Sequence, residues 1–254
     1  MDNIIKVRNL RVSLNGTEVL KGINLDVVKG ESLVIVGSSG CGKSVLLKTI
    51  LNLIGKDDGQ IYLFGEDTGK MDEKKVMETR SRIGMVFQNS ALLDSLSVWE
   101  NVGFYYLYHT DYSEEKIKGM AVDILRDVGM EGVENLLPEH LSGGMKKRVS
   151  VARALISKPE ILFYDEPTTG LDPITSESIT GLIRSIHARF KTTDITVTHD
   201  VKLASRISDR IALIDGGVIE DLGSFEELKM TSRNPIVRSF IDMGAENDKK
   251  QIFN

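Results

Sequence analysis

The sequence predicts an α/β fold in which a group of helices interrupts the strands of a parallel sheet. An apolar run over residues 33–36 leads directly into a glycine-rich segment and a helix pattern, which is typical of a buried parallel strand and its crossover helix. From residue 89 to residue 157 the strand pattern disappears and helix patterns replace it. Strands and helices then alternate again, as in a parallel sheet.

Short strands fill the first third of the chain. Residues 4–14 alternate between apolar and polar side chains, and the Asn15-Gly16 dipeptide predicts a hairpin turn into a second strand over 18–28. A helix is expected over 45–53, with Gly55 as its C-terminal cap. The remaining strands of this part are expected over 33–36, 60–64 and 83–87.

The helical insertion is expected to contain helices over 98–107, 113–128 and 143–156. Later strands are expected over 161–164, 195–198 and 211–214, with a helix after Asp172-Pro173 and a last helix opened by a Ser224–Glu227 capping box. We therefore expect one domain over 1–254. It divides into a core over 1–88 and 158–230, a helical subdomain over 89–157 and a polar tail over 231–254.

Composition excludes several classes of protein. With 254 residues, 41% of them hydrophobic, the chain can bury a full core, and its net charge of -5 argues against a surface that wraps nucleic acid. One cysteine, Cys41, excludes a disulfide framework and suits a reducing compartment. The apolar runs are shorter than a membrane span, and the N-terminus does not have the pattern of a signal peptide. A role at a membrane would therefore require a partner.

Residues 37–44 match a loop whose backbone N–H groups and lysine hold nucleotide phosphates. Their place between an apolar strand and a helix is the context that this mechanism requires. Lys43 is the candidate for the β- and γ-phosphates, Ser44 is a candidate Mg²⁺ ligand, and Cys41 fills a small position of the loop. The nucleotide-binding candidates of this segment are Gly37, Ser38, Ser39, Gly40, Cys41, Gly42, Lys43 and Ser44.

Polar residues follow three of the expected strands. Asp165 and Glu166 come after the strand over 161–164, where Asp165 is placed to coordinate Mg²⁺ and Glu166 to act as general base toward the attacking water. Gln88 is a candidate for contacting Mg²⁺ and water, although outside this framework it would be an ordinary turn residue. His199 lies at the ligand edge expected for a parallel sheet, where it can donate to the γ-phosphate.

A second segment, Leu141-Ser-Gly-Gly-Met145, opens a basic helix and is another candidate phosphate-binding helix N-terminus. One face of this helix has apolar side chains at packing intervals, namely Met145, Val149, Ala152 and Ile156. Its other faces have the basic side chains Lys146, Lys147, Arg148 and Arg153. Because the chain is acidic overall, we expect these to form a solvated face rather than a nucleic-acid contact.

These motifs, in this order, resemble the ATP-binding cassette (ABC) family over essentially the whole chain. The set comprises 37–44, Gln88, Leu141-Ser-Gly-Gly144, Asp165-Glu166, Gly170-Leu-Asp172 and His199. The resemblance implies a P-loop NTPase (RecA-like) core with an N-terminal antiparallel β-subdomain and an inserted α-helical subdomain. It also implies an ATPase that works as a head-to-tail homodimer. ATP and Mg²⁺ would lie between the phosphate loop of one chain and Ser142, Gly143 and Gly144 of the other, with Asp172 coupling the two sites.

A subfamily resemblance is also visible. Residues 85–104 and 141–148 are similar to the bacterial lipid-asymmetry (Mla/Mce-type) ATPases, in which the fifth signature residue is methionine, here Met145. The C-terminal segment 234–241 is similar too. The resemblance implies transport of phospholipid or another hydrophobic substrate that maintains the outer membrane. The implied partners are an integral membrane permease and a lipid-shuttle (Mce-type) substrate-binding protein. The ATPase would be cytoplasmic and peripheral on the inner membrane.

Two alternatives remain, namely the ATPase of a small-solute ABC importer and a non-transport ATPase of iron–sulfur cluster assembly. One residue departs from the family pattern, because Leu14 stands where an aromatic side chain usually stacks on adenine. Selectivity for ATP over GTP is therefore an inference from the family alone. The apolar segment 89–99 is expected to receive the membrane partner, with Leu92 and Leu93 as the main contacts.

We predict that Glu166→Gln retains ATP binding and traps a closed dimer, while hydrolysis falls about 10²–10⁴-fold, the range expected for loss of a general base. The reason is that a neutral amide cannot take the proton of the attacking water. Steady-state turnover, together with size-exclusion chromatography in ATP, measures both effects. Near-parental turnover would assign the base to another residue.

Overall fold

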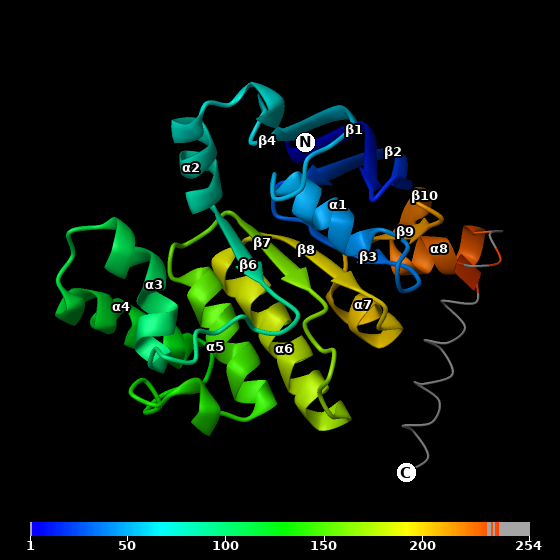
Figure 1. The fold of residues 1–254 in the computed structure, drawn as a ribbon. Coiled ribbons are helices and arrows are strands. Elements are labelled where there is room, and N and C mark those ends of the chain that lie inside the picture. The colour runs from blue at the N-terminus through cyan, green and yellow to red at the C-terminus, as the bar shows by residue number, and fades with distance from the viewer. Residues whose placement is uncertain (1, 233–234, 236, 239–254) are drawn as a thin grey trace, which may run out of the picture. The chain divides into compact units, whose positions relative to one another are not determined.

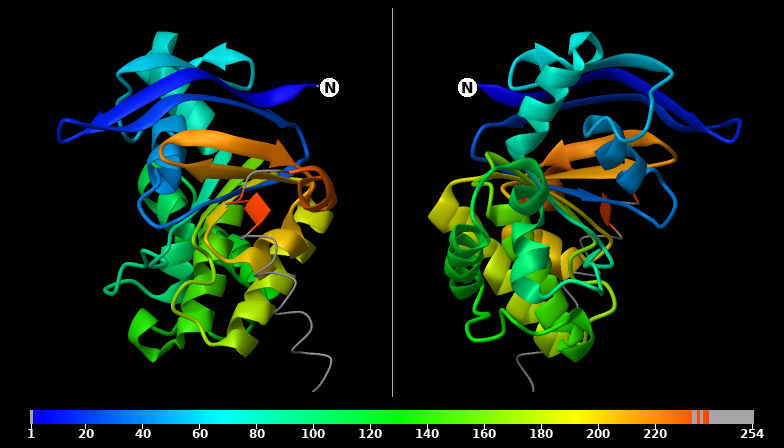
Figure 2. Two further views of the ribbon diagram at one scale, coloured as in Figure 1. Left: turned by 90° about the vertical axis from the view of Figure 1, so that its right-hand side faces the viewer. Right: turned by 60° about the vertical axis from the view of Figure 1, so that its left-hand side comes forward.

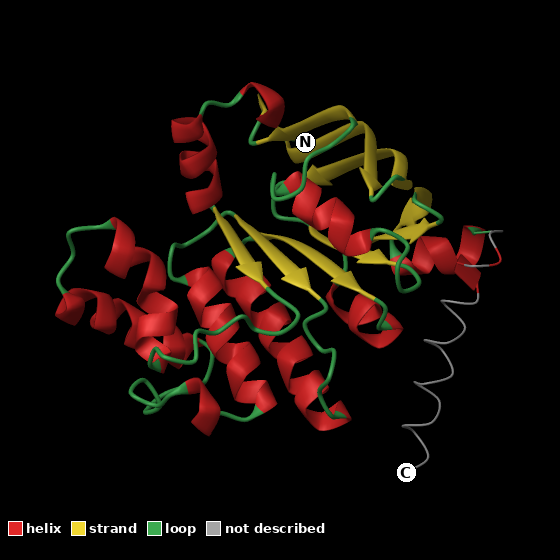
Figure 3. Ribbon diagram, viewed as in Figure 1, coloured by secondary structure: helices red, strands yellow, loops and turns green. Residues whose placement is uncertain are grey.

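The computed structural model describes residues 2–232, 235, 237 and 238. It divides into two compact units, a first unit of Met1–Arg80 and Lys191–Asn254 and a second unit of Ser81–Phe190. Both units contain helices and strands (Figure 3), which confirms the predicted α/β class. The expected helical subdomain, 89–157, lies within the second unit, and its limits stay a prediction. The expected tail over 231–254 lies mostly outside the described residues.

The first unit begins with an antiparallel sheet of order β2-β1-β4-β5. Its strands are β1 (Asn3–Leu14), β2 (Thr17–Val28), β4 (Asp58–Leu63) and β5 (Glu66–Asp67). Asn15 and Gly16 have φ values of 51° and 79°, as the central residues of a type I′ hairpin turn require. The predicted hairpin is therefore confirmed, and both views of Figure 2 show it as a long dark-blue ribbon.

Parallel strands form the other part of the first unit. Fully buried β3 (Ser32–Val36) pairs in parallel with β8 (Thr193–Thr198) and with β9 (Arg210–Asp215), and β10 (Val218–Gly223) adds an antiparallel edge. Val36, at the end of β3, is paired with Thr198 and with Leu213. The carboxyl ends of these strands therefore meet at one edge, which is where ligands bind in open parallel sheets. The helices of this unit are α1 (Lys43–Ile50), α2 (Glu73–Ser81, of which only Ser81 falls in the second unit), α7 (Val201–Ile207) and α8 (Phe225–Thr231), with the 3₁₀ helix η1 (Thr68–Lys70) (Figure 1).

Helix α1 ends before its predicted limit. Its last residue is Ile50, not Leu53, and Asn52 rather than Gly55 takes the left-handed conformation after the helix, with φ of 54°. The N–H of Leu53 donates to the carbonyl of Lys48 at 2.8 Å, and the N–H of Asn52 donates to the carbonyl of Thr49 at 3.0 Å. This is a Schellman motif, in which asparagine can replace the usual glycine. The expectation of Gly55 as the cap was wrong for this reason.

The second unit contains the parallel pair β6 (Ile83–Val86) and β7 (Ile161–Asp165) together with four long helices among its described residues. The helices are α3 (Val98–His109), α4 (Glu114–Asp127), α5 (Gly143–Leu155) and α6 (Pro173–Phe190), and η2 (Pro138–His140) precedes α5. Ser113 caps α4 by accepting a hydrogen bond from the N–H of Lys116. A capping box of Ser97 and Glu100 opens α3, a signal that sequence reasoning missed.

The loop before α3 is held by one buried amide, that of Asn101. Its Oδ1 accepts from the N–H of Leu93 at 2.7 Å. Its Nδ2 donates to the carbonyls of Leu93, Leu96 and Ser97 at 3.0, 2.9 and 3.1 Å. The backbone around Leu93 is therefore fixed, while the side chain of Leu93 is 43% exposed.

Several elements were not predicted. Helix α2 (Glu73–Ser81) buries only Thr79, so its sequence has no apolar period to recognise. Strand β10 has no fully buried residue apart from Gly223, and β5 has only two residues. In the described part of the chain, no helix is both long and apolar enough to cross a membrane.

Candidate functional site

The phosphate-loop candidates connect β3 to α1 in the first unit, as the sequence predicts. Lys43 is buried, and its Nζ donates to the carbonyls of Gly37 at 2.8 Å and Ser38 at 2.9 Å, so the loop closes around this ammonium. Ser38, Ser39 and Gly40 are exposed along the loop, and Ser44 is half-buried in the first turn of α1. Exposed loop backbone next to a helix N-terminus and a lysine is an arrangement that can bind an anion.

Glycine is required sterically at two positions of this loop. A Cβ on Gly37 would lie 2.2 Å from the carbonyl oxygen of Ile214 and 2.7 Å from Sγ of Cys41. Gly42, the N-cap of α1, has φ of 108°, and a Cβ there would lie 2.8 Å from Leu20. Cys41 is buried, and this burial raises the pKa of its thiol, against an opposing effect of the Lys43 charge. A protonated, buried thiol agrees with the expected space-filling role.

His199 lies at the same edge of the first unit as the phosphate loop. It directly follows β8, whose last residue, Thr198, is paired with Val36 immediately before Gly37. The His199 side chain is exposed. The next residue, Asp200, caps α7 by accepting from the N–H groups of Lys202 and Leu203 at 2.9 and 3.1 Å.

The second unit brings Gln88, Asp165 and Glu166 to one edge. Val86 of β6 is paired with Tyr164 of β7, so Gln88 and Glu166 each lie two residues beyond a matched pair. Asp165 and Glu166 are 6% and 9% exposed. Glu166 has a left-handed φ of 48°, rare for a non-glycine residue, and its Oε2 accepts from Oγ1 of Thr169 at 3.0 Å.

Lys147 of α5 reaches this same edge, contrary to the expected solvated face. It is only 4% exposed, and its Nζ donates to the carbonyl of Gln88 in a short hydrogen bond and to that of Glu166 at 3.4 Å. Burial lowers the pKa of Lys147, while Asp165 and Glu166 oppose this effect. The sequence did contain a signal for its burial, because Lys147 lies four and seven residues before the buried Val151 and Ala154.

The remaining candidates meet at the N-termini of α5 and α6. Ser142 is exposed and caps α5 by accepting from the N–H of Met145 at 3.3 Å. A Cβ on Gly144 would lie 2.6 Å from Cγ2 of Thr175, so α5 and α6 touch here. Asp172 caps α6, and the hydrogen bond from the Thr175 hydroxyl lowers the pKa of its carboxyl.

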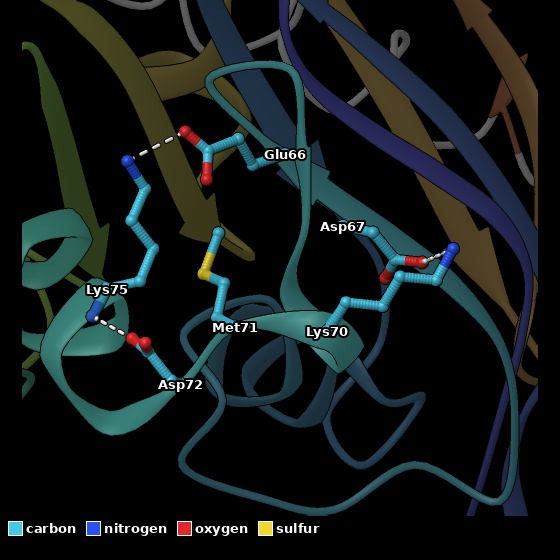
Figure 4. Close-up of a pocket in the computed structure, with 6 residues that line it drawn as sticks. All are labelled: Glu66, Asp67, Lys70, Met71, Asp72 and Lys75. Carbon is cyan, nitrogen blue, oxygen red and sulfur yellow. Dashed lines mark hydrogen bonds and ion pairs between the residues drawn. The ribbon is translucent and has the colours of Figure 1, made fainter.

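The structure therefore groups the candidates into two sets. Residues 37–44 and His199 lie in the first unit, and Gln88, Ser142, Gly143, Gly144, Asp165, Glu166 and Asp172 lie in the second. A pocket in the first unit has none of them in its lining (Figure 4). Its own lining side chains pair with one another, Lys75 with Glu66 at 2.8 Å and Lys70 with Asp67 at 3.6 Å.

Comparison with known proteins gives matches over most of the chain. A family model described as "ABC transporter" matches residues 20–169. "Protein TRIGALACTOSYLDIACYLGLYCEROL 3, chloroplastic" of Arabidopsis thaliana is 40% identical over 256 residues, covering 94% of this chain and 73% of the relative. "Probable ribonucleotide transport ATP-binding protein mkl" of Mycobacterium leprae is 35% identical, covering 94% and 68%, and "Methionine import ATP-binding protein MetN" of Carboxydothermus hydrogenoformans is 34% identical, covering 94% and 72%.

Solved structures agree with these matches. A dimeric ATP-binding cassette in a post-hydrolysis state with ADP and Pi superposes with a TM-score of 0.77 at 32% identity, covering 87% of this chain and 98% of the other. The structure of cbiO1 from Clostridium perfringens superposes with a TM-score of 0.80 at 29% identity, covering 96% and 99%.

We predict that Gly37→Ala lowers the affinity for ATP about tenfold or more, because the new methyl group would displace the loop from the Ile214 carbonyl. Titration with a fluorescent ATP analogue measures the affinity. Gly55→Ala is the matched control, since a Cβ there meets no atom within 4 Å. Equal affinities for the two variants would contradict the steric argument.

Proposed function

We propose that this chain, which belongs to the ABC transporter family, is the ATPase subunit of a transporter and powers the movement of phospholipid or another hydrophobic substrate through a membrane permease. The match at 40% identity over 94% of the chain is the observation that supports this substrate class. That relative is named after trigalactosyldiacylglycerol, which is a galactolipid. The similarity of residues 85–104 and 141–148 to lipid-asymmetry ATPases points to the same class of cargo.

We infer that the phosphate loop binds ATP through the exposed backbone of residues 38–40 and through Lys43. Nucleotide phosphates would replace the Gly37 and Ser38 carbonyls as partners of the ammonium. The candidate Mg²⁺ ligands, Ser44, Gln88 and Asp165, offer hydroxyl, amide and carboxylate oxygens, which fit a magnesium ion. Bound Mg²⁺ would neutralise the charge that develops on the phosphates.

Hydrolysis would use Glu166 as the general base. Its carboxylate is almost fully buried and is oriented by the Thr169 hydroxyl, so it can take a proton from one water molecule in a fixed direction. His199, exposed at the edge next to the phosphate loop, would donate to the γ-phosphate oxygens. Gln88 would contact the attacking water as well as the metal.

The complete site would need a second copy of the chain. Ser142 and Gly143 are exposed at the N-terminus of α5, where the first backbone N–H groups of a helix have no acceptor within the helix and would attract the phosphates of another chain's nucleotide. Asp172 lies close to them because α6 begins against Gly144, which suits a role in coupling the two sites. The dimeric relative with ADP and Pi supports this arrangement.

A permease would hold this ATPase at the cytoplasmic face of the inner membrane, with an Mce-type lipid-shuttle protein as a further partner. The exposed Leu93, on a loop fixed by Asn101, is the proposed contact for the permease. Small-solute import is the second candidate function, because other relatives are named for ribonucleotide transport and methionine import.

The contact to the nucleotide base is a separate point. Leu14, which is 36% exposed, offers only apolar contact to a nucleotide base.

A test is to purify the tagged chain from membranes with its permease and to reconstitute the complex in phosphatidylethanolamine–phosphatidylglycerol vesicles. We expect ATP-dependent movement of a fluorescent phospholipid, abolished by Glu166→Gln. Stimulation of ATP hydrolysis by methionine or a ribonucleotide, without phospholipid movement, would favour the second candidate and contradict the lipid assignment.

We also predict that Leu93→Glu abolishes co-purification of the permease, because a carboxylate replaces the exposed apolar contact. The isolated variant should still fold and bind ATP, as measured by its melting temperature and by nucleotide titration. Leu136→Glu is the matched control, since Leu136 is 38% exposed in the same unit. Retained co-purification of Leu93→Glu would place the docking site elsewhere.

A further inference from the structure

We propose that Lys147 is a positioning residue for hydrolysis. Its ammonium hydrogen-bonds to the main-chain carbonyls of both Gln88 and Glu166, so that helix α5 fixes the positions of both residues. This inference rests on the proposed function, which assigns Gln88 to Mg²⁺ and water and Glu166 to proton transfer. Lys147 itself touches neither nucleotide nor metal in this proposal.

The geometry gives one donor group two acceptors in the loops that follow two different strands. Gln88 follows β6 and Glu166 follows β7, and the Nζ of Lys147 donates to the main-chain carbonyl of each. A lysine ammonium has three donors and no acceptor, so both contacts can be made at once. The side chain is 4% exposed, so the surrounding atoms restrict it to this position.

The backbone that Lys147 holds is in an unfavourable conformation. Glu166 has φ of 48°, and Ser90 and Ala91, just after Gln88, have φ of 60° and 47°. Such conformations persist in non-glycine residues only where the surroundings hold them. Lys147 binds the carbonyl of Glu166. Arg153, also on α5, donates to the carbonyls of Ser90 at 2.7 Å and Ala91 at 2.5 Å.

A purely structural role does not account well for this choice of side chain. A buried ammonium is costly unless it is fully hydrogen-bonded, and an apolar side chain of similar length would fill the same space at lower cost. What the ammonium adds is a link between two carbonyls that belong to the two loops with proposed chemical roles. Its charge is in turn stabilised by Asp165 and Glu166.

Ser142 is the N-cap of the same helix, and the proposed dimer places it on the phosphates bound to the second chain. Lys147 lies five positions after Ser142, a distance of about 7.5 Å along the helix axis. Engagement of Ser142 by the partner's nucleotide would therefore move Lys147 together with the Gln88 and Glu166 carbonyls that it binds. In this way α5 would make hydrolysis at one site depend on occupancy of the other.

The test compares Lys147→Met with Lys146→Met in the full-length protein. We expect kcat of Lys147→Met to fall about 10–100-fold, the loss typical of a small misplacement of reacting groups. The Kd for ATP should stay within about twofold, because the phosphate loop is unchanged, and half-maximal activity should require more Mg²⁺. Lys146 is the matched control, since it is the adjacent lysine on α5 and is only half-buried.

Lys147→Gln provides a second variant should Lys147→Met fail to fold, as circular dichroism would show. Its amide donor is one atom shorter and cannot reach both carbonyls equally well, so we expect its kcat to fall below that of the parent and of Lys146→Met, with a Kd for ATP that stays within about twofold. Parental kcat in Lys147→Met would overturn the proposal. So would a lower kcat accompanied by an equally large loss of ATP affinity and by a lower melting temperature, because that combination indicates a general loss of structure.

Glu166→Gln is measured in parallel so that the two proposals can fail separately. If Glu166→Gln abolishes hydrolysis while Lys147→Met retains parental kcat, the positioning role is wrong and the proposed catalytic site stands. If Glu166→Gln hydrolyses ATP at the parental rate, the catalytic assignment is wrong and the positioning role falls with it.

Discussion

A cation bound to two main-chain carbonyls is the interaction on which the loops of this ATPase depend. Lys43 binds the carbonyls of Gly37 and Ser38, and Lys147 binds those of Gln88 and Glu166. Loops at strand ends have carbonyls with no partner in the sheet, and these carbonyls need donors when they are buried. A charged donor gives a stronger hydrogen bond than a neutral one, so these segments keep their shape without regular secondary structure.

Helix N-termini show the opposite balance, with donors that need acceptors. Ser142, Asp172 and Asp200 each place a side-chain oxygen on the first N–H groups of a helix. The N-cap of α1 is Gly42, which has no side chain with which to do this. No side-chain cap therefore competes with phosphate oxygens at this N-terminus, and the absence of acidic residues from the first turn adds to the attraction.

Much of the fold and of the candidate site could be predicted because their signals are local. The Asn15-Gly16 turn, the Ser224–Glu227 capping box and the apolar run of β3 are each read within a few residues. The prediction failed where tertiary contacts decide. Asn52 ends α1 although a glycine lies nearby, and Lys147 is buried although lysine normally stays in solvent. In both cases hydrogen bonds to carbonyls compensate for a conformation or a burial that the residue type disfavours.

The amide of Asn101 has a consequence for the mechanics of the loop before α3. Because one side chain bonds both the N–H and the carbonyl of Leu93, and also the carbonyls of Leu96 and Ser97, that loop has little conformational freedom left. A partner that touches Leu93 would therefore not need to order the loop, so association would lose little entropy. A rigid loop also transmits displacement. Movement of Leu93 by a partner would therefore move α3, which contains Asn101, as a rigid body.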